Sequence, residues 1–249
     1  MPPKRRPKTN GIGTLSEGPL HAALKAWCAQ PGDTFETMVD GFVVDIVRGE
    51  LLVEIETGNF ARLKRKLRLL TERHPVRLVH PIACNRWIVR VEDGEETSRR
   101  KSPKHGRIEH IFEQLVSIPS QFAHPSLSVE VLFTEEEVVR CYDPARRACR
   151  KGWVASERRL LRVTDHHLLA TPADLAALLP PDLPHPFTTA DLAEASGIRR
   201  RLAQRMAYCL RALGLLADVG KCGNARLHAR VGPKTQPRAT VPHGTRAEG

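Results

Sequence analysis

Aromatic residues are scarce in this chain of 249 residues, at 5% of the sequence. Flat stacking platforms for unpaired bases are therefore not expected. None of the six cysteines forms a Cys-x-x-Cys pair, and no two histidines have zinc-ligand spacing, so a structural zinc site is not expected. The chain also lacks a glycine-rich phosphate loop, a nucleophile elbow and a His-Glu-x-x-His pair. These absences argue against the P-loop NTPases, the α/β-hydrolases and the zinc proteases.

Long apolar runs are absent too, and the basic start of the chain has no apolar signal-peptide region. We therefore expect no membrane contact. Free thiols in a reducing cytoplasm are expected, with the protein associated with the nucleoid when it binds DNA.

The charge is strongly positive, at +11 with a pI of about 9.8. A uniformly basic composition, as in a GC-rich genome, is one explanation. However, the cations are segregated, and segregation favours a polyanionic partner such as nucleic acid. Basic residues gather in four segments, at 1–10, 62–73, 99–107 and 199–230.

Composition and proline usage divide the chain into five parts. We expect a disordered basic arm at 1–16, an α/β domain at 17–165, a short helix with a proline-rich linker at 166–186, a module at 187–231, and a disordered tail at 232–249.

Within the α/β domain, apolar periodicity predicts alternating helices and strands. Asn59 is expected to cap the second helix, which has a basic outer face at 62–68. The expected elements are a helix at 19–30, strands at 42–47 and 51–57, a helix from Phe60, strands at 76–80 and 86–91, a basic loop at 99–107, a helix at 108–116 and a strand at 127–133.

In the C-terminal module, Thr188 and Asp191 form a capping box for a helix that Gly197 ends. A second helix is expected at 199–213, followed by strands at 215–219 and 225–231. This order resembles a winged helix-turn-helix. The resemblance implies double-stranded DNA as partner and a set of contacts from the second helix and the hairpin: Arg199, Arg200, Arg201, Gln204, Arg205, Lys221, Asn224 and Arg226. A module used for protein contacts, for example in a homodimer, is the alternative.

The strands at 42–47 and 51–57 carry three carboxylates. With a two-residue turn at Gly49 and Glu50, paired residue numbers sum to 99, so Asp45 lies opposite Glu54 and Glu56 follows on the same face. Carboxylates this close need compensation from a cation, a neighbouring lysine or arginine, or water. A hard cation such as Mg²⁺ or Mn²⁺ suits an all-oxygen site. A solvated acidic face is the alternative.

A helix, a strand with Asp45, a strand with Glu54-Ile55-Glu56 and a further helix resemble the core of the PD-(D/E)xK nuclease superfamily. The resemblance implies an α/β (α+β) fold with a restriction-endonuclease-like mixed sheet flanked by helices. More narrowly, the chain resembles a group of uncharacterised prokaryotic proteins with a C-terminal winged helix.

The resemblance also implies Mg²⁺-dependent DNA endonuclease activity, with Asp45, Glu54 and Glu56 as metal ligands. Glu56 stands where most members have lysine, so Lys64 or Lys66 on the following helix would supply the cation. Glu17 is the candidate for a further acid, with Glu36 second. The missing lysine supports the alternative, a catalytically inactive DNA-binding regulator.

Overall fold

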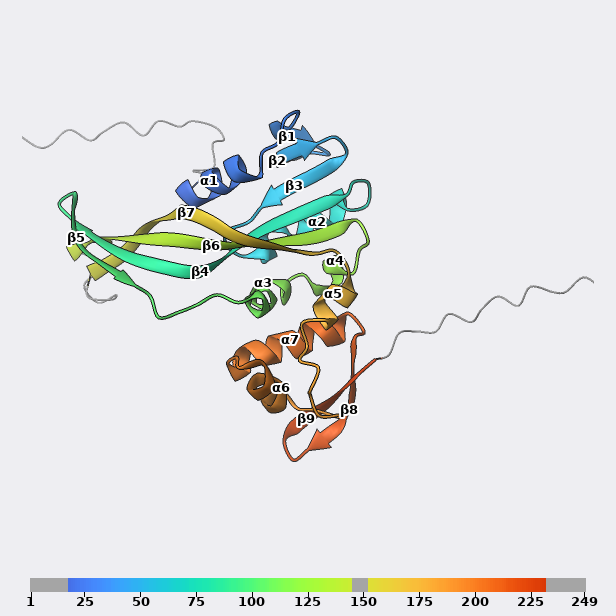
Figure 1. The fold of residues 1–249 in the computed structure, drawn as a ribbon. Coiled ribbons are helices and arrows are strands. Elements are labelled where there is room, and N and C mark those ends of the chain that lie inside the picture. Colours follow the sequence, from blue (N-terminus) through green and yellow to red (C-terminus); the bar gives the residue numbers. More distant parts are fainter. Residues whose placement is uncertain (1–17, 145–151, 232–249) are drawn as a thin grey trace, which may run out of the picture.

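The computed structural model describes residues 18–144 and 152–231. The basic arm, Glu17 and the C-terminal tail predicted above lie outside the described residues. The fold is mixed α/β, with a large mixed sheet flanked by helices on both faces (Figure 1).

The sheet begins with an antiparallel meander, β1-β2-β3. Two long strands, β4 and β6, then run parallel to β3. Neighbouring strands follow the order β1-β2-β3-β4-β6-β7, and β5 also pairs with β4. β3 and β4 are parallel, as are β4 and β6, whereas β6 and β7 are antiparallel. The strands are β1 Thr34–Val39, β2 Phe42–Arg48, β3 Leu51–Ile55, β4 Val76–Glu92, β5 Glu95–Lys101, β6 Leu127–Tyr142 and β7 Trp153–Leu169.

Strand lengths differ most from the sequence prediction. The separate strands expected at 76–80 and 86–91 are one strand, β4. The first residues of the loop expected at 99–107 belong to β5, which ends at Lys101. Pro81 is tolerated inside β4 because β3 pairs with β4 only up to Val79, and β5 begins to pair at Trp87. Between these points one edge of β4 has no strand beside it, so the missing proline N–H breaks no ladder.

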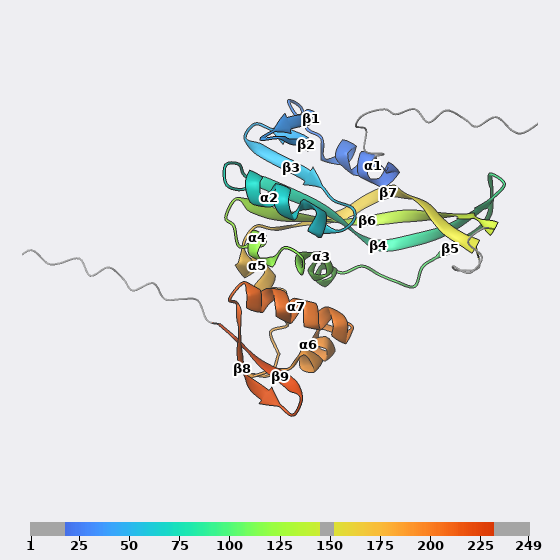
Figure 2. The same ribbon diagram turned by 180° about the vertical axis from the view of Figure 1, so that it is seen from behind.

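Helices cover the two faces of the sheet unequally (Figures 1 and 2). Helix α1, Pro19–Cys28, packs alone on one face, where Leu20 and Leu24 meet Val53 and Val79. The opposite face is covered by short helical segments: η1 Phe60–Leu63, α2 Lys64–Leu70, η2 Ile108–Ile111, α3 Phe112–Leu115 and α4 Pro119–Phe122. The predicted cap is confirmed, since the Asn59 side chain accepts a hydrogen bond from the Ala61 N–H.

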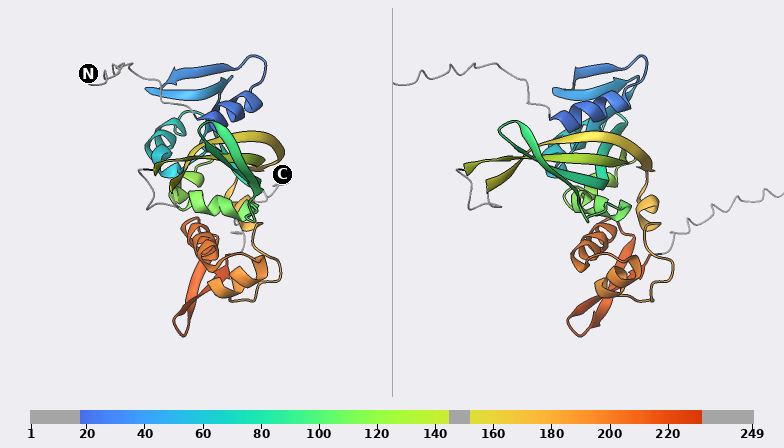
Figure 3. Two further views of the ribbon diagram at one scale, coloured as in Figure 1. Left: turned by 90° about the vertical axis from the view of Figure 1, so that its left-hand side faces the viewer. Right: turned by 60° about the vertical axis from the view of Figure 1, so that its left-hand side comes forward.

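The C-terminal elements are three helices and an antiparallel hairpin, and they lie beyond α3 and α4 (Figures 1 and 3). The predicted capping box at Thr188–Asp191 is confirmed, and a second capping box lies at Thr171–Asp174. Gly197 ends α6 with a φ of 61°, the left-handed conformation that glycine adopts at no steric cost. The elements are α5 Pro172–Ala176, α6 Thr189–Ser196, α7 Arg200–Ala212, β8 Leu216–Cys222 and β9 Ala225–Arg230.

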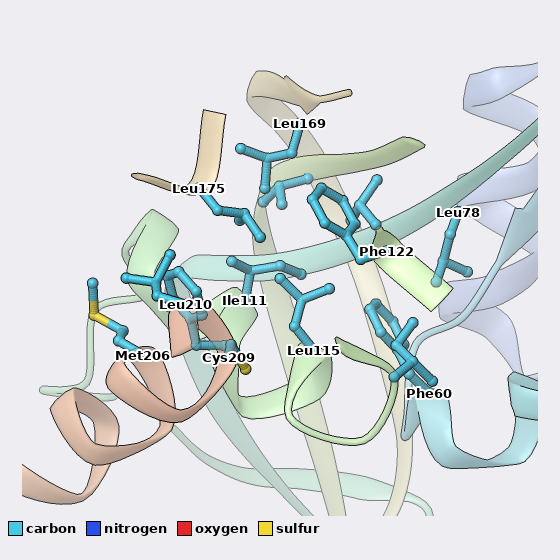
Figure 4. Close-up of a cluster of buried hydrophobic side chains, with 14 of the residues drawn as sticks. Phe60, Leu78, Ile111, Leu115, Phe122, Leu169, Leu175, Met206, Cys209 and Leu210 are labelled. Carbon is cyan, nitrogen blue, oxygen red and sulfur yellow. The ribbon is translucent and has the colours of Figure 1, made fainter. Parts of the chain in front are cut away.

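One hydrophobic core runs from the sheet into these elements (Figure 4). Ile111 and Leu115 of the α3 region pack in the same cluster as Met206 and Leu210 of α7, and all four side chains are buried. Arg107 adds a polar link, donating to the carbonyl oxygen of Ser196 at 2.8 Å. The proline-rich segment at 180–186 therefore does not separate two independent cores.

Two further observations concern only the described residues. None of their helices combines the length and apolar character needed to cross a bilayer. The five cysteines among them are free thiols.

Candidate functional site

The first candidate site lies where β2 and β3 separate. The predicted register is confirmed near the turn, because Arg48, Val47 and Ile46 pair with Leu51, Leu52 and Val53. The ladder stops at the next position. There the Asp45 side chain accepts a hydrogen bond from the Ile55 N–H at 2.8 Å, in place of a backbone partner.

Strand β1 is also irregular beside Asp45. The β1–β2 pairing skips Glu36, whose φ is 49°, a conformation that L-residues rarely adopt. Helix α1 supports both acids from one face: His21 lies 3.3 Å from Asp45, and Lys25 donates to Glu36 at 2.8 Å. Although burial would raise the pKa of Asp45, the bonds from His21 and the Ile55 amide hold it below its usual value.

Glu54 points toward α2 and is only 3% exposed. The Lys66 ammonium of α2 donates to the Val43 carbonyl oxygen and also forms an ion pair with Glu54, with Nζ 2.5 Å from Oε1. The buried Glu54 carboxylate is thus compensated by Lys66. Burial raises the pKa of Glu54 to about 7, with nearby Asp45 adding to the rise and the Lys66 ammonium opposing it. We call Asp45, Glu54, Lys66 and His21 the carboxylate cluster.

Two predicted members fall outside this cluster. β3 ends at Ile55, and the Glu56 carboxylate turns back to accept from the Gly58 N–H at 2.6 Å. Lys64 is exposed on α2, two residues before Lys66 and therefore on the other side of the helix. Within residues 18–144 and 152–231, no group of three or more His, Cys, Asp and Glu side chains is placed to hold a metal ion. The expected set of three carboxylates is therefore two carboxylates and a lysine.

The alternative of a solvated acidic face is wrong for Glu54, which is buried. Sequence reasoning also missed His21. Its signal was the spacing of His21 and Lys25, which places both on one helix face beside buried Leu24.

A buried histidine beside the cluster gives a pH prediction. His80 donates from Nδ1 to the Glu56 carbonyl oxygen at 2.6 Å, and burial lowers its pKa to about 4 from 6.5. Its contribution to stability should be lost as pH falls from 6.5 through 4, by about 3 kcal/mol. Glu54 has the opposite sign, because its raised pKa stabilises the fold below about 4.5 and loses that contribution as pH rises through 7.

We therefore expect the two slopes largely to cancel in the wild type between pH 6.5 and 4.5. Urea denaturation of His80→Asn should instead show stability rising as pH falls through this range. Asn keeps a donor for the Glu56 carbonyl oxygen but does not titrate. Parallel pH profiles for the two proteins would contradict the assignment of a neutral, buried His80.

The second candidate site is formed by α7 and the β8–β9 hairpin. Leu202, Met206 and Leu210 recur every four residues along α7, so they are buried together on the side facing the rest of the protein. The opposite side carries polar residues at helical spacing: Arg200, Gln204, Tyr208 and Arg211. This face is basic because two of its four residues are arginines and none is an acid. The other two, Gln204 and Tyr208, are neutral hydrogen-bonding groups.

The hairpin closes a groove against this face, with a volume of about 250 Å³. Asn224 and Arg226 contribute from the hairpin, and Arg226 also pairs with Asp218. His228 of β9 is 2% exposed and lines the groove. We call this the α7–hairpin groove, lined by Thr189, Arg200, Gln204, Ala207, Tyr208, Arg211, Asn224, Ala225, Arg226 and His228.

Of the predicted contact residues, the structure brings Arg200, Gln204, Asn224 and Arg226 together at the groove. Others are exposed near it without lining it: Arg199, Arg201 and Lys221. Arg205 does not line the groove. It is half-buried and pairs with Glu113 of α3 at 3.5 Å. Sequence reasoning missed Tyr208, Arg211 and His228. The first two could have been found by extending the Arg200–Gln204 stripe along the helix.

The chain belongs to the family described as Domain of unknown function (DUF8091), whose model matches residues 18–170. This match covers the sheet and ends just after β7. An uncharacterised protein of Treponema pallidum (strain Nichols) is 30% identical over 239 residues, covering 94% of each chain, so it spans the C-terminal elements as well. No solved structure matches the chain significantly.

Proposed function

We propose that this protein binds double-stranded DNA through α7 and the β8–β9 hairpin. The observation that carries the proposal is the exposed face of α7, where arginines and Gln204 lie beside a hairpin with further cations. Helix, turn, helix and hairpin, with Phe187 bridging to His228 of β9, is also the order of a winged helix-turn-helix. In that fold the second helix enters the major groove.

The chemistry of the surface suits a duplex. Guanidinium groups bind phosphate oxygens, and the amides of Gln204 and Asn224 are side chains that read adenine edges. Six cations lie on or beside the groove and would contact phosphates: Arg199, Arg200, Arg201, Arg211, Lys221 and Arg226. Arg205 is excluded from this set because it pairs with Glu113.

Fluorescence anisotropy with a short labelled duplex tests the proposal. Six phosphate contacts predict a slope of about −5 for log affinity against log salt concentration. The double variant Arg200→Gln, Arg201→Gln should reduce that slope by about 2 and weaken binding at 0.1 M salt by about 50-fold.

A charge-matched control separates this surface from net charge alone. Arg159→Gln, Arg162→Gln removes the same charge from β7, where both residues already pair with acids. We expect it to bind within about 3-fold of the wild type, since exposed pairs contribute little. Equal losses in the two double variants would refute the α7–hairpin surface, and no duplex binding by the wild type would refute the function.

The carboxylate cluster favours a second function, Mg²⁺-dependent hydrolysis of DNA. The order α1-β1-β2-β3-α2-β4, with β4 parallel to β3, supports the resemblance to PD-(D/E)xK nucleases. Asp45 and Glu54 come together at the end of the β2–β3 ladder, and Lys66 reaches them from the next helix. The alternative remains a DNA-binding regulator in which this cluster is inactive.

The residues present fit a magnesium ion in their donor chemistry. Glu54 is buried, and Asp45 lies near enough to raise its pKa. The Lys66 ammonium compensates Glu54 at 2.5 Å, so a metal ion bound at Oε1 would displace that contact. One or two carboxylates suffice for Mg²⁺, which otherwise keeps water or substrate phosphate as ligands. When bound, the ion would activate water and neutralise charge on the phosphate. Lys66 would compensate negative charge beside it.

A further inference from the structure

The α7–hairpin groove contains two polar atoms that the described protein leaves unsatisfied. Nδ1 of His228 and Nε of Arg211 are both buried without a hydrogen-bond partner. They come from different elements, β9 and α7, and both residues line the groove. Buried polar atoms are normally hydrogen-bonded. An acceptor seated in the groove would satisfy Arg211 Nε–H and, in the tautomer protonated at Nδ1, His228 as well.

The surroundings specify the charge of that acceptor. Arg200, Arg211 and Arg226 all line the groove, its lining residues include no acid, and Arg226 also pairs with Asp218. Burial and the nearby Arg211 guanidinium hold the pKa of His228 below its ordinary value, so its ring is neutral at pH 7 and offers one N–H donor. Tyr208 and Asn224 add further donors.

We propose that the α7–hairpin groove is a discrete phosphate-binding site, with Arg200, Arg211 and His228 as its donors. Guanidinium forks match the tetrahedral oxygens of phosphate, and a volume of about 250 Å³ accommodates one phosphate group with part of its sugar. This assignment rests on the proposed DNA binding in one respect: in the complex, the group held is a backbone phosphate of the duplex. Free phosphate shares the chemistry and is the other source.

The site differs from the rest of the DNA surface because two of its donors, Arg211 and His228, are half-buried or buried. Arg199, Arg201 and Lys221 are exposed, so they would contact phosphates at the open surface without a defined binding site. Arg211 is half-buried and lies near the buried His228, so its contact requires a phosphate seated in the groove. A seated phosphate would set the register of the protein on the duplex.

The full chain allows a test with two probes, inorganic phosphate and a short duplex. At equal ionic strength, 50 mM phosphate in place of sodium chloride should raise the melting temperature of the wild type by about 3 °C. Arg211→Gln should lose this rise and bind the duplex about 10-fold more weakly. Arg205→Gln is the matched control, because it lies on the same helix but outside the groove, and should retain the rise.

Arg200→Gln provides a second variant at an exposed position, should Arg211→Gln fold poorly. No phosphate-specific rise in a wild type that binds the duplex would overturn the site and leave the proposed function standing. A rise that Arg211→Gln abolishes, with duplex affinity unchanged, would overturn the backbone assignment in favour of free phosphate. The same rise in a protein that binds no duplex would overturn the proposed function and support the site.

Discussion

Replacing Glu54 by Gln should abolish Mg²⁺-dependent nicking of plasmid DNA, with a loss of about 100-fold or more. The amide keeps the size of the carboxylate but cannot carry its charge beside Asp45 and Lys66. Asp45→Asn should have a comparable effect. Because burial raises the pKa of Glu54 to about 7, wild-type nicking should increase as pH rises through 7 and the carboxyl group ionises.

Two paired comparisons make this test specific. Glu56→Gln should retain most activity, since its carboxylate bonds to Gly58 instead of joining the cluster. Lys66→Met should reduce nicking strongly, whereas Lys64→Met should not, because only Lys66 contacts Glu54. Nicking that survives Glu54→Gln would show that the carboxylate cluster is not the catalytic site. No nicking with Mg²⁺ or Mn²⁺, together with intact duplex binding, would favour the inactive regulator.

Truncating Leu210 to Ala should destabilise the whole protein by about 2–5 kcal/mol. Leu210 is fully buried where α7 meets the α3 region, so its loss leaves a cavity in a core shared by the sheet and the C-terminal elements (Figure 4). We expect urea denaturation to show one transition, shifted to lower urea, because the buried side chains of α7 belong to the same cluster as those of the sheet.

Val219→Ala is the control for this substitution. Val219 lies on β8 in the same region but is 51% exposed, so removing its methyl groups leaves no cavity. Its stability should change by less than about 0.5 kcal/mol. Two separate transitions in the wild type, or a negligible effect of Leu210→Ala, would contradict the shared core.

Features governed by neighbouring residues could be predicted from the sequence. The capping boxes at Thr171 and Thr188 and the Asn59 cap depend on spacings of two or three residues. The register of β2 against β3 followed from a short turn and from alternation. The caps and this register depend on residues close together in the sequence, which is why sequence spacing alone predicts them.

Features governed by distant partners could not be predicted in this way. β7 alternates poorly because two of its arginines pair with acids on β6, Arg158 with Glu136 and Arg162 with Glu135. Glu56 was predicted on the face of Glu54, but β3 ends one residue earlier and the chain turns. Strand length depends on which strands lie alongside, and those strands come from far along the chain.

The arrangement of the two candidate sites was likewise not visible in the sequence. Helix α1, β2 and β3 lie at the opposite end of the molecule from the β8–β9 hairpin (Figures 1 and 3). We therefore expect duplex DNA held at α7 to reach the carboxylate cluster only by bending around the protein or by extending to a second copy.

The central claim, that α7 and the hairpin bind duplex DNA, is tested most directly by hydrogen–deuterium exchange of the full chain with and without a duplex. The account predicts slower exchange in peptides covering 199–213 and 216–230, and little change in peptides from β7. Protection concentrated in β7 or the β4–β5 hairpin, with none at α7, would contradict it.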